Sequence, residues 1–166
     1  KSQCILGYKS YELDFYANQK NALIGKSKQL KVYFLVLKDK SQKSVLLQEQ
    51  YWKGGNKNEA VICIGIDSKN NITWSHVFSW SDKSSFKVNI SADIMNHKIL
   101  NDIQFKNIID ETYSTLEKEF KRKEFADFSY VTVEPSGTAI IISTILVIIS
   151  CIGILVVLLK NEFKNY

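Results

Sequence analysis

A glycine-rich run, YWKGGNKN, contains residue types that could hold an anion, and it stands directly before a long apolar run. Adjacent glycines such as Gly54 and Gly55 can adopt positive φ, which lets successive backbone N–H groups converge into an anion-binding nest. Lys53 and Lys57 would add positive charge. The alternative is a tight, solvated turn with Trp52 packed on the core. We favour the turn because the run lacks P-loop spacing.

Asp67 directly follows the apolar run and is the main candidate for a cation site. Together with Asp82 or Asp93 it could offer carboxylate oxygens to Ca²⁺ or Mg²⁺. No DxDxDG loop is present, and Asp is common in turns, so turn chemistry is the stronger interpretation of Asp67. We therefore predict no resident cofactor, with Ca²⁺ or Mg²⁺ as the alternative.

The chain has two histidines, which limits the catalytic chemistry it can assemble. His76 alternates with Trp74 and Phe78 on an apolar face, which favours a structural role over a catalytic one. His97 lies in a polar stretch and is expected to be solvated. Neither histidine belongs to a zinc-type spacing, and no Ser-His-Asp order can be argued.

Three cysteines are too few, and odd in number, for a disulfide scaffold. Cys63 lies in the apolar run and is predicted to be a buried apolar residue. Cys151 falls in the C-terminal apolar segment. Cys4 would pair with Cys63 only if the first segment packed against that strand, because disulfide geometry is strict.

The strands that must position these residues can be read from the apolar pattern. Residues 30–37 predict a strand buried on both faces, and residues 60–66 predict a central strand. Residues 67–71 have turn composition, so 72–80 completes a hairpin. Residues 128–133 predict one more short strand. The 72–80 strand is expected to bury one face, formed by Ile72, Trp74, His76, Phe78 and Trp80.

The helices are read from apolar spacings of three and four residues. Residues 8–23 indicate a helix that Gly25 ends, and residues 45–52 fit either a strand or a short helix. Residues 100–125 predict an amphipathic helix capped by Asn101 or Asp102. Its apolar stripe comprises Phe105, Ile108, Ile109, Tyr113, Leu116 and Phe120. These elements predict an α/β (α+β) fold, a small mixed sheet flanked by helices.

The uncharged segment Gly137–Leu159 predicts a single C-terminal transmembrane helix. At about 1.5 Å per residue it is roughly 34 Å long, enough to cross a hydrocarbon core of about 30 Å. The chain therefore divides into a globular domain at 1–135, a membrane helix at 136–160 and a short tail at 161–166. Small residues within the span, Ser143, Thr144, Ser150 and Gly153, would allow oligomerisation through this helix.

Charge favours one orientation of the span. The tail carries Lys160 and Lys164, whereas residues 126–137 carry no Lys or Arg. The positive-inside rule therefore predicts a cytoplasmic tail and a globular domain outside the cytoplasm. The alternative is a tail-anchored cytoplasmic domain whose basic residues 121–123 contact acidic lipids.

The globular part is only mildly basic. Residues 1–135 carry 20 Lys and Arg against 16 Asp and Glu, a net charge of +4, and the lysines are scattered. A nucleic-acid-binding role is therefore not indicated. The chain is 166 residues long and 45% hydrophobic, which excludes a disordered or collagen-like chain.

The order Trp52, Gly54-Gly55, Lys57-Asn58 and then VICIG resembles the TPM-domain family over roughly residues 8–125. The resemblance implies a membrane-anchored domain outside the cytoplasm, often with a C-terminal transmembrane helix. It also implies either a phosphatase or metal-binding role, or a role in assembling membrane complexes. Glu59 stands where the family usually has Gly, and FSWS replaces its later glycine-rich stretch. These departures weigh against an enzymatic role.

Two functions follow from these observations. The favoured one is a membrane-anchored module, without its own catalysis, that binds or assembles a membrane-protein partner. The alternative is a phosphatase-like hydrolase or cation-binding domain that holds phosphate at Lys53 and uses Asp67 as a metal ligand or base. The hydrolase requires these two residues and an acidic neighbour in one concave site. The candidate binding residues are Trp52, Lys53, Gly54, Gly55, Lys57 and Asn58.

Two triplets, Asn71-Ile72-Thr73 and Asn89-Ile90-Ser91, match the acceptor pattern for N-linked glycans. Chance matches are frequent in an Asn-rich chain. The pattern matters only in a eukaryotic secretory setting.

Overall fold

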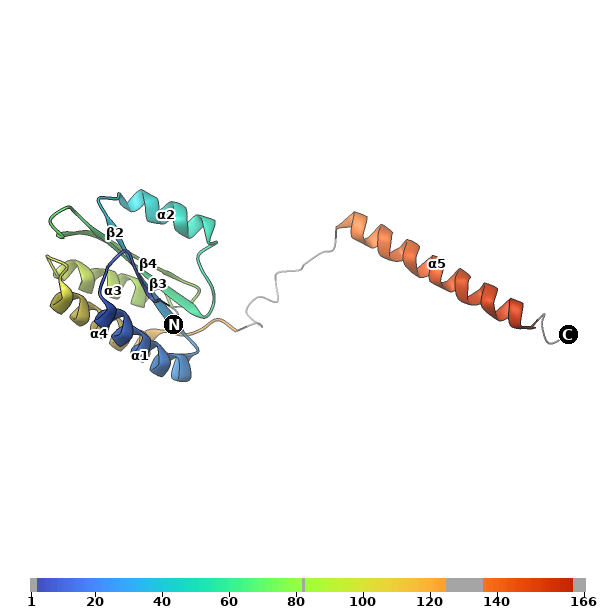
Figure 1. The fold of residues 1–166 in the computed structure, drawn as a ribbon, viewed down its shortest axis with the longest axis horizontal. Helices are drawn as coiled ribbons and strands as arrows, with labels where there is room; N and C mark the ends of the chain where they lie inside the picture. Colours follow the sequence, from blue (N-terminus) through green and yellow to red (C-terminus); the bar gives the residue numbers. More distant parts are fainter. Residues whose placement is uncertain (1–2, 82, 125–135, 163–166) are drawn as a thin grey trace. The chain divides into compact units, whose positions relative to one another are not determined.

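The computed structural model describes residues 3–81, 83–124 and 136–162. The chain forms two compact units, Lys1–Glu124 and Phe125–Tyr166 (Figure 1). The first unit falls within the globular domain predicted at 1–135, and residues 125–135 lie outside the described residues. The strand predicted at 128–133 lies outside the described residues.

The first unit is built on a mixed four-stranded sheet, as the sequence predicted. Its strands are β1 (Ile5–Leu6), β2 (Lys31–Lys38), β3 (Glu59–Ile66) and β4 (Ile72–Ser79), in the spatial order β1-β2-β3-β4. The β1–β2 and β2–β3 pairs are parallel, and β3–β4 is an antiparallel hairpin. The predicted central strand and hairpin are therefore confirmed.

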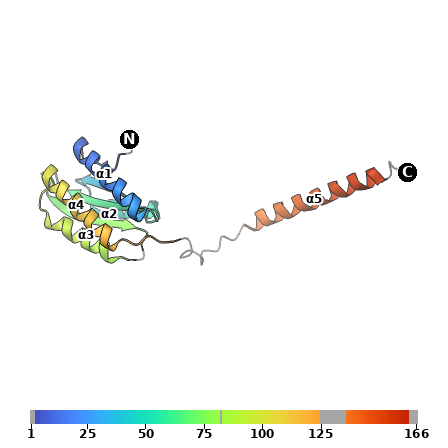
Figure 2. The same ribbon diagram turned by 90° about the horizontal axis from the view of Figure 1, so that it is seen from below.

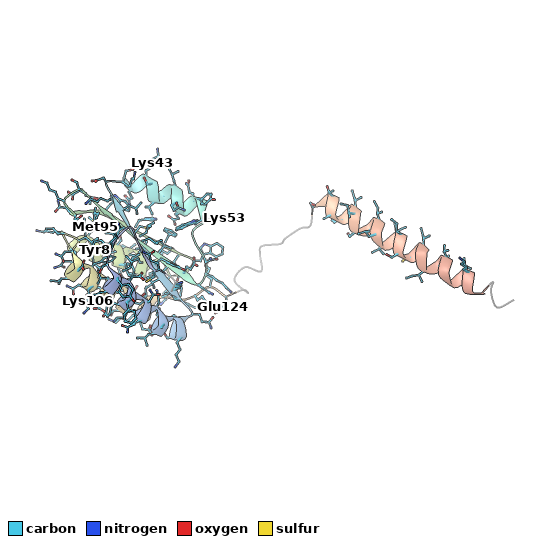
Figure 3. All side chains as sticks on the ribbon, in the orientation of Figure 1. Tyr8, Lys43, Lys53, Met95, Lys106 and Glu124 are labelled. Carbon is cyan, nitrogen blue, oxygen red and sulfur yellow. The ribbon has the colours of Figure 1, made fainter. Side chains whose placement is uncertain are left out.

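Four helices cover the sheet unequally. The helices α1 (Tyr11–Lys28), α3 (Ser85–Asn96) and α4 (Asp102–Glu119) lie on one face, which we call the three-helix face (Figures 1 and 2). The single helix α2 (Gln42–Tyr51) lies on the other, which we call the α2 face. In Figure 3, Lys43 and Lys53 lie on the α2 side of the sheet, and Tyr8 and Lys106 lie on the three-helix side.

The three-helix face holds the main core. Phe105 of α4 is fully buried, with its ring edge-on to Phe34 of β2 at 5.7 Å and to Tyr8 at 5.1 Å between centroids. Such edge-to-face pairs stabilise a core beyond the area they bury. The predicted α4 stripe is confirmed, because all six of its apolar residues are buried. Asn101 caps the helix by accepting from the backbone N–H of Gln104 at 2.9 Å.

Two helix predictions need correction. Gly25 does not end the first helix, which continues to Lys28. The left-handed residue that ends it is Gln29 (φ 52°), whose N–H donates to the carbonyl of Gly25 at 3.1 Å. The ambiguous segment 45–52 falls almost wholly within helix α2, which begins at Gln42.

The strand faces also differ from expectation. In β2 burial alternates, so only the three-helix side, Val32, Phe34 and Val36, is fully buried. The prediction of burial on both faces was wrong because α2 covers the other side only in part. The pairing of β4 with β3 shifts register between Gly65 and Ile66 of β3. Ile72 therefore packs in the three-helix core, away from the face of Phe78.

Helix α3 has no counterpart in the sequence prediction. It buries only Phe86, Ile90 and Ile94, one residue per turn, among serines and asparagines. Such a sparse stripe on a polar helix is a weak periodic signal. Its position along the edge strand β4 brings Ser91 to Ser75, whose hydroxyls lie 2.5 Å apart.

The second unit contains α5 (Gly137–Glu162), an apolar helix. Residues Gly137–Val156 have a mean hydropathy of 3.0, and none of this segment is buried. The helix is thus long and apolar enough to cross a membrane, as predicted. The hydroxyls of Ser143, Thr144 and Ser150 each donate to a carbonyl oxygen of α5 itself at 2.8–2.9 Å.

Candidate functional site

The α2 face carries a second, smaller set of apolar side chains. The strand register places three rows across it: Tyr33-Val61-Phe78, Leu35-Cys63-His76 and Leu37-Gly65-Trp74. Val45 is the one fully buried apolar residue of α2, and it packs on this set. One short helix therefore covers the middle of a face that is three strands wide.

Polar contacts hold α2 in place. Nε2 of His76 lies 2.6 Å from Oε2 of Glu49 on α2. The indole N–H of Trp74 donates to the carbonyl of Lys40 at 2.8 Å, and that of Trp80 donates to the carbonyl of Lys53 at 3.0 Å. The contact with Glu49 agrees with the structural role predicted for His76. Together these contacts attach helix α2 and its two ends to β4 and the residue that follows it.

The glycine-rich run forms the turn that follows α2. Lys53, Gly54 and Gly55 all have left-handed φ, between 52° and 91°. A side chain at Gly54 would also lie 3.1 Å from the Trp80 indole nitrogen, so this turn requires glycine. The turn interpretation is confirmed in its packing, because Trp52 lies against Phe78 with 6.0 Å between ring centroids.

The turn does not form the anion-binding nest that was the less favoured interpretation of this run. The N–H of Gly54 donates to the carbonyl of Glu49 at 2.8 Å, and the N–H of Gly55 donates to the carbonyl of Trp52 at 2.9 Å. Lys53 N–H likewise donates to Gln50 at 3.0 Å. These donors close the end of the helix and satisfy its last carbonyls. They are not directed at a ligand.

An open cavity of about 400 Å³ lies beside this turn, and it is mainly apolar. Its walls come from β1, β2, the start of β3 and the turn. Trp52 forms one side and remains 42% exposed. Glu59 is the one charged residue among those described at its wall. The lining residues are Leu6, Tyr33, Leu35, Trp52, Gly55, Asn56, Glu59 and Val61.

The structure brings only part of the predicted site to this cavity. Trp52 and Gly55 line it, whereas Lys53, Gly54, Lys57 and Asn58 are not among its described lining residues. The backbone of Asn58 instead accepts from Lys31 N–H at 2.8 Å and helps to begin the β2–β3 pairing.

Asp67 lies far from this site. It follows β3, while the lysine-containing turn precedes it, and eight residues at about 3.3 Å each separate the two by roughly 26 Å. Its carboxylate accepts from the backbone N–H groups of Lys69 and Asn71 and from the Asn71 side chain, at 2.7–2.9 Å. The Asn71 hydrogen bond is the main cause that lowers the Asp67 pKa. The Asp67 carboxylate therefore stabilises the turn in which it lies.

The other chemistry-bearing side chains do not converge either. Among the described residues, no three His, Cys, Asp or Glu side chains form a group that could hold a metal ion. Asp82 lies outside them. Cys4 and Cys63 are free and belong to opposite faces of the sheet, so the considered disulfide does not form. Burial is the main cause that raises the pKa of both thiols to about 12, which keeps them protonated and poorly nucleophilic.

His97 is not solvated as predicted. It follows α3, with Nδ1 2.7 Å from Gln104 Oε1 and Nε2 2.9 Å from Glu111 Oε2. Burial acts to lower its pKa, but the hydrogen bonds to Glu111 and Gln104 outweigh burial and raise it. His97 thus joins α3 to α4.

No family model, curated protein or solved structure matches this chain.

The sequence pattern did not predict this cavity. Leu6 belongs to a two-residue strand, too short for any periodic signal. Tyr33 and Leu35 were expected to be covered. A cue did exist in α2, whose apolar residues outnumber the single position that it buries.

Proposed function

We propose that this protein is a single-pass membrane protein whose globular unit binds an extracytoplasmic segment of a membrane-protein partner and has no catalysis of its own. The observation that carries this proposal is the open apolar cavity on the thinly covered α2 face. The length and apolar composition of helix α5 support the membrane-anchor part of the proposal.

Exposed apolar side chains occur both on helix α2 and at the wall of the cavity. Contiguous exposed apolar surface is typical of interaction sites, and Trp and Tyr are common among the residues that dominate binding energy. Tyr51 is 82% exposed and lies beside Trp52 at the end of α2. The other exposed apolar residues on these elements are Leu6, Leu46 and Leu47.

The hydrolase alternative receives less support. It requires Lys53, Asp67 and an acidic neighbour in one concave site, and the first two lie at opposite ends of β3. The glycine N–H groups that would hold phosphate already donate within the chain. Cation binding at Asp67 is likewise disfavoured, because its carboxylate oxygens serve the turn.

We place the globular unit outside the cytoplasm and the tail inside, on the positive-inside argument from Lys160 and Lys164. The likeness of residues 8–125 to the TPM-domain family agrees with this arrangement and remains part of the proposal. Oligomerisation through α5 would rest on close packing at Gly153, because the hydroxyls of the span already bond within their own helix.

Affinity capture of the tagged full chain from its native membranes in mild detergent tests the proposal. We expect one stoichiometric membrane-protein partner, identified by mass. Tyr51→Ala and Trp52→Ala should each reduce its recovery several-fold. Leu23→Ala is the matched control, since Leu23 is 70% exposed but belongs to α1.

Recovery of the chain alone, or equal loss of partner with Leu23→Ala, would contradict binding through the α2 face. Tyr51 is so exposed that its replacement is not expected to unfold the unit. A loss confined to Tyr51→Ala and Trp52→Ala would locate the partner there.

A further inference from the structure

The two glycan-acceptor triplets differ in what the fold does with their asparagines. Asn89 is exposed on α3, whereas Asn71 is half-buried at the start of β4. We propose that Asn89 carries an N-linked glycan and that Asn71 does not. This inference rests on the extracytoplasmic placement in the proposed function and goes beyond it, because it assigns a modification site.

The reaction forms one C–N bond and breaks one C–O bond and one N–H bond, and the proton passes to a base of the transferase. The Nδ2 atom of Asn89 attacks the first sugar carbon of a lipid-linked oligosaccharide diphosphate. The new C–N bond replaces the carbon–oxygen bond to the phosphate, the lipid diphosphate leaves, and Nδ2 loses one proton. The donor and its transferase belong to the secretory membrane, so this chain supplies only the acceptor amide.

The triplet must be modified before α3 forms. Residues two apart do not face one another on a helix, so Asn89 and Ser91 present a common surface only in the extended chain. In the folded unit the Ser91 hydroxyl oxygen lies 2.5 Å from Ser75 Oγ and 3.3 Å from the Ser75 carbonyl oxygen, so it is engaged with β4. The fold then decides which modified asparagine can be accommodated.

Asn89 can keep one hydrogen bond to Glu119 with a sugar attached. Its Nδ2 donates to Glu119 Oε1 at 2.9 Å and to Oε2 at 3.2 Å, and a glycosylated amide retains one N–H. The neighbouring Val88 is 68% exposed, so the surrounding surface is open. The inward side of this turn is formed by Ile90, which is buried, so the exposed Asn89 side chain lies outside the core.

Asn71 has no such room. Its Nδ2 donates to Asp67 Oδ2 at 2.7 Å inside a turn whose backbone N–H also binds that carboxylate. A strand bridge joins Asn71 to Ile99, and the next residue, Ile72, donates its N–H to Lys98 at 2.9 Å. The Asn71 side chain is thus half-buried within a hydrogen-bonded loop, whereas that of Asn89 is exposed, so a sugar meets more crowding at Asn71.

The position of Asn89 also fits the proposed binding surface. Helix α3 lies on the three-helix face, opposite α2 and the apolar cavity (Figure 1). A glycan there would shield the three-helix side from protein contacts. It would leave the α2 face free for a partner.

The test uses the full chain in membrane vesicles from its natural source. Peptide-N-glycosidase treatment should change its electrophoretic mobility in a single step. Mass spectrometry should then find aspartate in place of Asn89, with Asn71 unchanged. In the full chain expressed in the same cells, Asn89→Gln should abolish the shift, while Asn71→Gln and Ser91→Thr should retain it.

Protease treatment of the same sealed vesicles reports the placement independently. A protected globular unit without sugar on Asn89, or with sugar on Asn71, would overturn the glycan assignment and leave the placement intact. A globular unit digested from the cytoplasmic side would overturn both the placement and the glycan assignment.

Discussion

The two faces of the sheet differ in how completely helices cover them. On the three-helix face, three helices enclose a core in which Phe34 and Phe105 are completely buried. On the α2 face, one ten-residue helix buries Val45 and is held mainly by hydrogen bonds to β4. The same strands thus support a closed core on one side and an open apolar cavity on the other.

This difference separates stability from recognition. Folding free energy scales with the apolar area removed from water, which is concentrated on the three-helix face. The residual apolar surface on the α2 face contributes little to folding and is available for a partner. Substitutions on the two faces should therefore have different consequences.

The largest effect is expected from Phe105→Ala on the three-helix face. Removing a fully buried ring leaves a cavity and should lower the free energy of unfolding by about 3–5 kcal/mol. Urea unfolding of the full chain in detergent measures this loss. Phe15→Ala is the control, since Phe15 is 45% exposed, and its effect should be much smaller. Similar losses for both would contradict the assignment of the main stabilising core to the buried side chains of this face.

A smaller loss should follow Gly65→Ala on the α2 face. A Cβ at Gly65 would lie 2.0 Å from Trp74 Cε2, so the indole must move and release the carbonyl of Lys40. Overpacking of this kind costs about 1–3 kcal/mol. Tryptophan fluorescence should shift as the ring moves. In a Trp74→Ala background the same substitution should cost almost nothing, and a persistent cost there would contradict the steric explanation.

Glu49→Ala tests how α2 is held. It removes the contact with His76, and because both groups are partly exposed the loss should be about 1 kcal/mol. Hydrogen exchange should accelerate in α2 and remain unchanged in α4, since local opening reflects local contacts. Glu117→Ala, on α4, provides the opposite control. Equal acceleration in both helices would show that α2 is not an independent unit.

The smallest effect concerns pH and the three-helix face. Because the folded pKa of His97 is raised above its ordinary value of 6.5, its contribution is complete below that value. It is lost as pH rises through the higher folded pKa. The charged groups that face the ring are Glu111 and Asp93, with Gln104 as a neutral partner. The free energy of unfolding should therefore fall over this window, and His97→Gln should flatten the profile. An unchanged profile would remove His97 as the cause.

Local patterns were sufficient for much of the fold. The central strand β3, the β3–β4 hairpin, the stripe of α4 and the membrane-length helix α5 all follow from runs or periods within one segment. The predictions were wrong where the apolar pattern was weak, or where a residue type typical of a helix end lay inside a helix. Helix α3 buries too few residues to be recognised, and Gly25 resembled a helix end although Gln29 supplies the left-handed residue.

The candidate site was less accessible to prediction. Trp52 and Gly55 were identified because the glycine-rich run marks a turn beside an aromatic residue. Leu6, Tyr33 and Leu35 were not, since they reach the same cavity from strands far apart in the chain.

The sequence by itself determined the strands β2, β3 and β4, the helix α4 and the membrane-length span, because hydrophobic periodicity is a local property of the chain. Only the tertiary structure decided that Leu6, Tyr33 and Trp52 line one cavity. It also decided that the glycine N–H groups close a helix end and that one face of the sheet stays thinly covered. These outcomes depend on strand order and helix placement, which are set by contacts between residues distant in sequence.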